Sequence, residues 1–151
     1  MPTNYDFFRA IGWFKRVGGT IVAFDTYETE GGGLELLWDA VTTDISLAST
    51  LTTSRRTDAV KVPLNFSVEA SLTVDLYDAA ASVQCWVYCP DQSDQAAASP
   101  AANFDGLTTK RAIGPLWVRT SATGTIAARA NIATVDSYAV GTVGFRWARR
   151  N

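Results

Sequence analysis

The stretch "SVEASLTVDLYD" (residues 67–78) decides the fold class. Apolar side chains occupy every second position of this stretch: Val68, Ala70, Leu72, Val74 and Leu76. A β-strand turns successive side chains to opposite faces, whereas an amphipathic helix needs apolar residues every three to four positions. The alternation therefore predicts a β-strand with one face buried and one face in solvent.

Further strands are expected on both sides of this one, because runs rich in β-branched and aromatic residues recur between turn signals. We expect them at residues 20–28, 34–39, 59–66, 82–89, 112–121, 125–135 and 137–150. Residues 40–57 are expected to be a long connection with at most one edge strand, and residues 90–109 a long surface loop. The runs do not alternate with helical segments, so the sequence predicts an all-β fold, an antiparallel β-sandwich of jelly-roll or Ig-like type.

The N-terminal segment is dense in aromatic side chains. Apolar positions within residues 4–17 recur at helical spacing, which favours a short helix, but a strand that ends in the turn at 17–20 fits nearly as well. We therefore expect an N-terminal aromatic arm, residues 1–19, and a single β-sandwich domain, residues 20–151.

Charge and hydropathy limit the partners of the chain. The net charge of −2 and the isoelectric point near 5.0 give no overall attraction to nucleic acid or to an anionic membrane. No segment approaches about 18 consecutive apolar residues, so no transmembrane helix is expected. Charged residues between Asp6 and Arg16 interrupt the N-terminal stretch, which argues against a signal peptide and predicts synthesis in a cytoplasm.

Both cysteines lie in "SVQCWVYC" (residues 82–89), four positions apart. On a regular strand this spacing separates the two Cα atoms by roughly 13 Å, whereas a disulfide needs roughly 4.4–6.8 Å. A structural zinc site needs about four cysteine or histidine ligands, and the chain has two cysteines and no histidine. We expect Cys85 and Cys89 to be buried thiols, with an intermolecular disulfide as the alternative.

The sequence argues against catalysis. Without histidine there is no Ser-His-Asp or Cys-His arrangement, so acid–base chemistry would fall to carboxylates. Asp25, Glu28, Glu30 and Glu35 cluster around a triple glycine, where a glycosidase pair is one interpretation and a solvated polar turn the other. We expect the polar turn, and hence no enzyme, no cofactor and no metal site.

A candidate interface follows from the strand positions that face away from the core. If Val83, Cys85 and Val87 point inward, the residues between and after them point outward, and the same reasoning applies to the three C-terminal strands. Tryptophan, tyrosine and arginine are enriched at interface hot spots. A covered face and a ligand platform are the alternatives. With the aromatic arm, the candidate interface residues are Phe7, Phe8, Trp13, Phe14, Trp86, Tyr88, Trp117, Arg119, Arg129 and Arg146.

Three stretches, "SVEASLTVDLYD", "SVQCWVYCPD" and the terminal "VGTVGFRWARRN", give the chain a resemblance. From about residue 58 onward it resembles the β-sandwich accessory proteins of tailed-bacteriophage virions, which decorate or cement the capsid. The resemblance implies a non-enzymatic structural virion protein that binds neighbouring capsid subunits or copies of itself, as a homo-oligomer, in virions made in a host cytoplasm. Neither a membrane nor a specific nucleic acid is expected as a partner.

Two other functions stay open at this point. One is a carbohydrate-binding module, in which Trp86, Tyr88 and Trp117 form a stacking platform beside the 90–109 loop. The other is a tail-tube or tail-adaptor subunit, which would assemble into rings.

Overall fold

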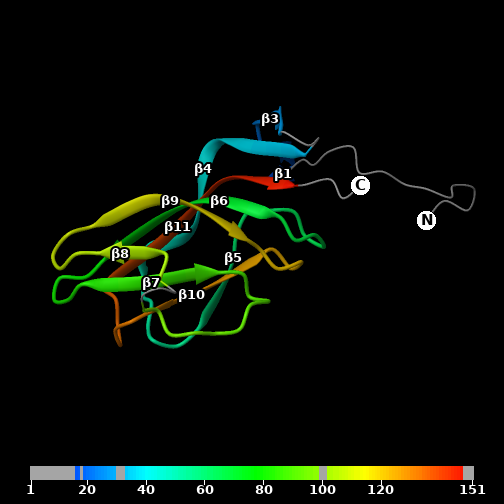
Figure 1. The fold of residues 1–151 in the computed structure, drawn as a ribbon. Helices are drawn as coiled ribbons and strands as arrows, with labels where there is room; N and C mark the ends of the chain where they lie inside the picture. The colour runs from blue at the N-terminus through cyan, green and yellow to red at the C-terminus, as the bar shows by residue number, and fades with distance from the viewer. Residues whose placement is uncertain (1–15, 18, 30–32, 99–101, 148–151) are drawn as a thin grey trace, which may run out of the picture.

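The computed structural model describes residues 16–17, 19–29, 33–98 and 102–147, and within these ranges the chain is all-β (Figure 1). The strands are β1 (Arg16–Val17), β2 (Thr20–Ile21), β3 (Phe24–Glu28), β4 (Leu34–Ser49), β5 (Arg56–Ala59), β6 (Glu69–Tyr77), β7 (Val83–Tyr88), β8 (Phe104–Gly106), β9 (Ala112–Arg119), β10 (Thr125–Ala130) and β11 (Ser137–Trp147). Across the described ranges, no helix is present that would span a membrane.

Most of the strands form two antiparallel sheets. One sheet has the spatial order β5-β10-β7-β8, and the other has the order β3-β4-β11-β6-β9. β1 and β2 pair with each other in a separate small hairpin. The expected all-β architecture is therefore confirmed, and it is consistent with a β-sandwich.

The last eight strands pair in a nested order. The first of them, β4, pairs with the last, β11, and β5 pairs with β10. Inside these pairs, β6 pairs with β9 and β7 with β8. The chain thus behaves as one long hairpin that is rolled into two layers.

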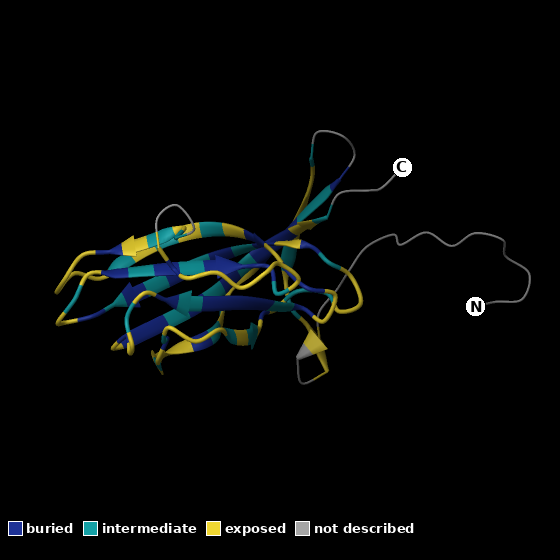
Figure 2. Ribbon diagram, turned by 60° about the horizontal axis from the view of Figure 1, so that its bottom comes forward, coloured by how far each residue is buried: buried dark blue, intermediate teal, exposed yellow. Residues whose placement is uncertain are grey.

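The core lies between the two layers, and Figure 2 shows buried residues alternating along their strands. The decisive stretch behaves as expected, because β6 buries Ala70, Leu72, Val74 and Leu76 completely and turns the residues between them outward. Facing it, β7 and β10 contribute residues such as Val87 to the same apolar cluster. Each fully buried valine or leucine stabilises the fold by about 1.5–3 kcal/mol relative to an exposed side chain.

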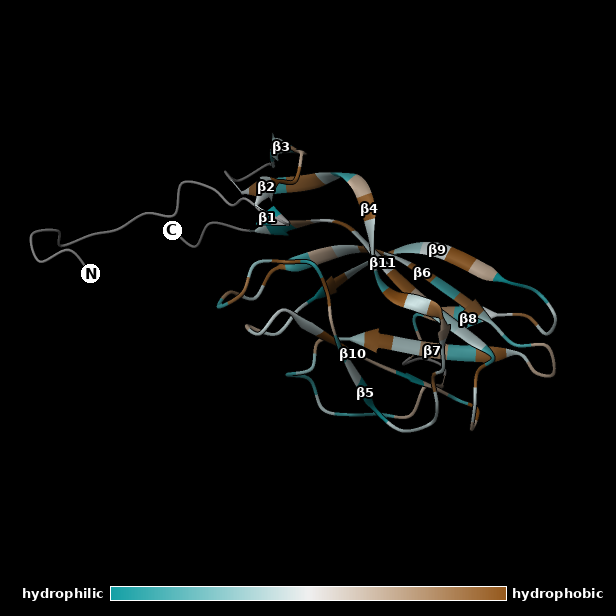
Figure 3. Ribbon diagram, turned by 180° about the vertical axis from the view of Figure 1, so that it is seen from behind, coloured by the Kyte–Doolittle hydropathy of each residue, from teal (hydrophilic) through white to brown (hydrophobic). Residues whose placement is uncertain are grey.

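An extension projects beyond the sandwich (Figures 1 and 3). It consists of β3, the first part of β4 and the end of β11, and it has its own apolar cluster around Leu36, Trp38 and Phe145. At Gly144 the two backbones approach so closely that a Cβ atom would lie 2.1 Å from the carbonyl oxygen of Leu36. Only glycine permits this approach.

The predicted connection at residues 40–57 is wrong over most of its length. β4 continues to Ser49 inside the five-stranded sheet, and β5 occupies residues 56–59. The threonines of this region are β-branched and suit an extended strand. Register shifts in the β4–β11 pairing carry the strand from the extension into the sandwich, as bulges bend a strand.

Other predicted boundaries are also corrected. The strand predicted at 59–66 is wrong except at Ala59, which is the last residue of β5. The residues after it do not continue the strand, because Pro63 donates no hydrogen bond and Asn65 has a φ of 69°, in the left-handed region. The run at 20–28 is split into β2 and β3, and the predicted loop at 90–109 contains β8. Residues 16–17 belong to a strand, which contradicts the helical alternative there. Residues 1–15 of the predicted arm lie outside the described residues.

Candidate interaction surfaces

The predicted interface residues do not form one surface. Phe7, Phe8, Trp13 and Phe14 lie outside the described residues. The other six divide between the two sheets. The four-stranded sheet carries Trp86, Tyr88 and Arg129, and the five-stranded sheet carries Trp117, Arg119 and Arg146.

The prediction of one continuous outward face is therefore wrong. Both groups point away from the core, and the outer faces of two packed sheets lie on opposite sides of the sandwich. Alternation predicts whether a residue lies on the inner or the outer face of its own sheet, but it does not predict which of the two sheets the strand belongs to. For the same reason, the expected sugar platform of Trp86, Tyr88 and Trp117 does not exist.

On the four-stranded sheet, the aromatic pair of β7 is stacked. The rings of Trp86 and Tyr88 are nearly parallel, at 11°, with centroids 3.8 Å apart. The guanidinium of Arg55 lies 5.5 Å from the centroid of the Tyr88 ring. Only 3% of Tyr88 is exposed, so the expectation that it is an exposed interface residue is wrong.

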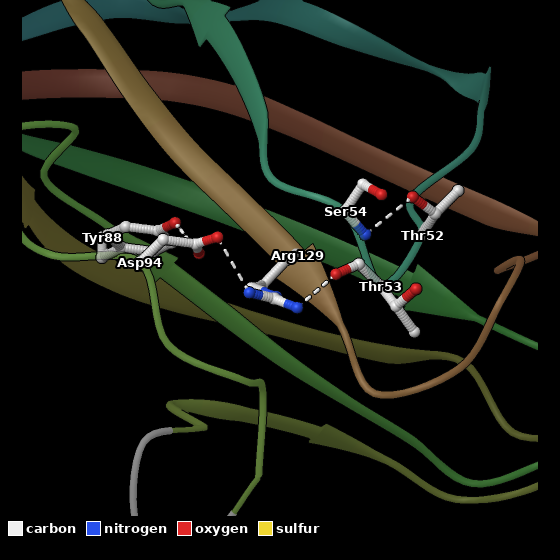
Figure 4. A network of polar contacts seen from close by, with 6 residues as sticks. All are labelled: Thr52, Thr53, Ser54, Tyr88, Asp94 and Arg129. Carbon is white, nitrogen blue, oxygen red and sulfur yellow. Dashed lines mark hydrogen bonds and ion pairs between the residues drawn. The ribbon is translucent and has the colours of Figure 1, made fainter.

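A polar network covers this tyrosine (Figure 4). The Tyr88 hydroxyl donates to Oδ1 of Asp94 at 2.6 Å, and Nη1 of Arg129 donates to Oδ2 of the same carboxylate at 2.9 Å. Arg129 also donates to the carbonyl of Thr53, and Arg55 donates to the carbonyl of Pro90. The segments before β5 and after β7 are thereby fastened over the sheet.

The network changes the protonation of its members. Burial, together with the hydrogen bond to Asp94, raises the pKa of Tyr88 to about 12. The hydrogen bond from Tyr88 and the charge of Arg129 lower the pKa of Asp94. The hydroxyl therefore stays protonated and the carboxylate stays charged at neutral pH. The polar groups around Tyr88 bind to other residues of the same chain, which matches the alternative of a covered face for this part of the sheet.

On the five-stranded sheet, Trp117 is 40% exposed. The guanidinium of Arg146 lies 4.6 Å from the centroid of its ring and is paired with Glu69 on β6. Nε of Arg119 donates to Oγ of Ser67 at 2.8 Å. The arginines on this surface are therefore engaged with their own chain, and the tryptophan is left partly in solvent.

Two exposed neighbours of Trp117 were not among the predicted residues. Ile113 is 63% exposed, and Pro115 is also exposed. Both lie on the outer side of β9, in line with Trp117, and we call these three residues the β9 stripe. The sequence did hold the signal, because the alternation that puts Trp117 outside puts residues 115 and 113 outside when it is extended backward.

The cysteines and the acidic residues near the triple glycine were the candidates for reactive groups. Cys85 and Cys89 are both buried free thiols, as predicted, and burial raises the pKa of Cys85 to about 12. Asp25 is exposed, and Glu35 is half-buried on the neighbouring strand, while Glu30 lies outside the described residues. In the part of the chain that the structure describes, no three acidic or cysteine side chains are grouped as metal ligands.

Comparison with protein families finds no family model that matches the chain. Comparison with curated proteins finds no significant match.

Proposed function

We propose that this chain is a non-enzymatic structural protein of a virion, which binds copies of itself or neighbouring capsid subunits and reinforces the particle. The observation that carries the proposal is the nested strand pairing, with β4–β11 outermost and β7–β8 innermost. We infer from this order that the sandwich is of jelly-roll type rather than Ig-like. Viral capsid domains are prominent among jelly-roll proteins.

The surfaces of the sandwich support a role in assembly. On the outer face of the four-stranded sheet Tyr88 is covered by contacts with Asp94 and Arg55, whereas the five-stranded sheet exposes the β9 stripe at its edge. Exposed apolar residues in a row mark contacts more often than catalysis. Tryptophan in such a row is the side chain that most often anchors an interface.

Light scattering of the purified full-length chain, followed by electron microscopy, tests the proposal. We expect a defined oligomer or closed particle whose mass is a multiple of the chain mass, with many equal contacts adding through avidity. A chain that stays monomeric up to its solubility limit, and that does not bind assembled capsids of its own particle, would contradict the proposal. Rings of stacked subunits would favour the tail-tube or tail-adaptor alternative.

The carbohydrate-binding alternative keeps one supporting observation. Lectins also use jelly-roll sandwiches, and Trp117 offers an exposed ring on a flat sheet. One face of that ring already carries Arg146, which leaves the other face for a sugar. A glycan array separates the two functions, because sugar binding that is lost in Trp117→Ala would favour the lectin over the virion protein.

A further inference from the structure

We propose that the β9 stripe is the docking site for the aromatic N-terminal segment, residues 1–15, of a neighbouring copy of this chain. The inference rests on the proposed function and deepens it, because it names the surface and the segment through which subunits join.

The stripe is exposed to solvent. Ile113 and Trp117 keep a large part of their apolar surface in water, and Pro115 lies between them. Their direct neighbours on β6 are Asp75, Thr73 and Ser71, whose short polar side chains leave the stripe open on that side, while the Arg146 guanidinium lies over one face of the Trp117 ring. Water around a contiguous apolar row is released when a partner covers the row.

The stripe is small. Three partly exposed side chains offer apolar area on the order of 300 Å². A stable contact between two rigid proteins buries about 800 Å² on each partner. The stripe alone is therefore too small to hold two sheets face to face, but a narrow segment that packs its side chains along the row fits it.

The edge position of β9 limits how a segment can bind to it. Among the described residues, β9 is an edge strand of the five-stranded sheet, and only β6 pairs with it in that sheet. Such a free edge can accept an added strand. Pro115, in the middle of β9, has no N–H, and within sheets proline is confined to positions where the ladder does not need that donor. Strand addition at this edge is interrupted, so the contact is made by side chains on the outer face.

The chain itself contains an apolar segment that could cover the stripe. Fifteen residues precede β1, and they include the apolar residues Tyr5, Phe7, Phe8, Ile11, Trp13 and Phe14. Fully extended, such a segment reaches about 50 Å, whereas the stripe from residue 113 to 117 spans about 13 Å. The segment therefore has both the length and the apolar side chains to cover the stripe.

The segment is long enough to reach the stripe of its own copy as well, and the proposed function, which requires contacts between subunits, selects the neighbouring copy. The arm leads through β1 and β2 into β3, and β3 and β9 are opposite edges of the same sheet. Four strand spacings, about 19 Å, separate these edges. A neighbour whose β9 edge faces the β3 edge of this copy brings its stripe to the origin of the arm. This head-to-tail contact repeats around a ring or shell.

Complementation between two full-length variants tests the inference. The stripe variant carries Ile113→Ser and Trp117→Ala, and the arm variant carries Trp13→Ala and Phe14→Ala. Each variant alone should self-associate roughly 30-fold more weakly than the wild type, as expected for loss of a tryptophan anchor. Mixed one to one, they should form a heterodimer, because the intact arm of one binds the intact stripe of the other.

A matched control separates docking from folding. Leu47→Ser removes a side chain that is 48% exposed on the part of β4 that does not pair with β3, away from β9, and should leave self-association unchanged. Circular dichroism should show that all variants keep their β-structure. A mixture that stays monomeric, or a stripe variant that associates as the wild type does, would overturn the inference while the proposed function stands. A wild-type chain that never self-associates would also overturn the inference, and the proposed function would fail only if that chain did not bind capsids of its own particle either.

Discussion

Replacing Tyr138 by phenylalanine should stabilise this protein. Tyr138 lies on β11 and is completely buried in the main core, next to Cys85. Its hydroxyl is one of the buried polar atoms in the described residues that have no hydrogen-bond partner. Burial raises the pKa of this tyrosine well above 10, so the group stays neutral but remains unsatisfied.

The magnitude follows from two opposing terms. A buried hydroxyl without a partner costs about 1–3 kcal/mol relative to water, and this cost disappears in Tyr138→Phe. The variant loses the packing contacts of one oxygen atom, a handful of pairs at about 0.1–0.2 kcal/mol each, or about 0.5–1 kcal/mol in total. The net gain is about 1 kcal/mol, because the ring and its contact with the Arg56 guanidinium are retained.

Urea unfolding followed by circular dichroism measures this gain. With a slope of about 2 kcal/mol/M, the midpoint should rise by about 0.5 M while the slope stays the same. Tyr77→Phe is the matched control, because Tyr77 lies half-buried on the outer side of β6 and its loss of a hydroxyl should change stability by less than about 0.5 kcal/mol. If Tyr138→Phe destabilises the protein by about 1 kcal/mol or more, the hydroxyl has a partner such as a buried water, and the reasoning fails.

Three further predictions concern the polar network, the thiol and the extension. Asp94→Ala removes both bonds to the carboxylate and should lower stability and expose residues 90–98 to proteolysis; an unchanged cleavage rate would show that the network does not hold the loop. Stability should fall above pH 9 by about 1.4 kcal/mol per pH unit on account of Cys85, because the unfolded thiol ionises while the folded one, with a pKa of about 12, does not. Cys85→Ala should remove that part of the slope in urea titrations between pH 8 and 11, and equal slopes in the two proteins would refute the assignment. Gly144→Ala should destabilise by about 3 kcal/mol or more, since its Cβ collides with the Leu36 carbonyl, and a thermal melting point close to that of the wild type would contradict the close backbone approach.

The sequence by itself determined the fold class, because two-residue periodicity is a local property of the chain. The alternation through residues 67–78 predicted β6 and named its buried side, and the spacing of the cysteines predicted two thiols that do not bond to each other. It also identified Trp117 as outward. These inferences need only the geometry of a single extended strand.

Only the tertiary structure decided which strands are neighbours. The second half of β4 was missed because its apolar residues are interrupted by Thr, Ser and Asp and mostly stay exposed, with Ile45 buried but Val41 and Leu47 in solvent. Its place beside β11 depends on partners about a hundred residues away. The covered state of Tyr88 was missed because Asp94 and Arg55 reach it from separate loops. Trp86 and Trp117 look alike in sequence, yet they lie on opposite sides of the sandwich, since alternation relates a side chain to its own sheet and long-range pairing assigns the sheet.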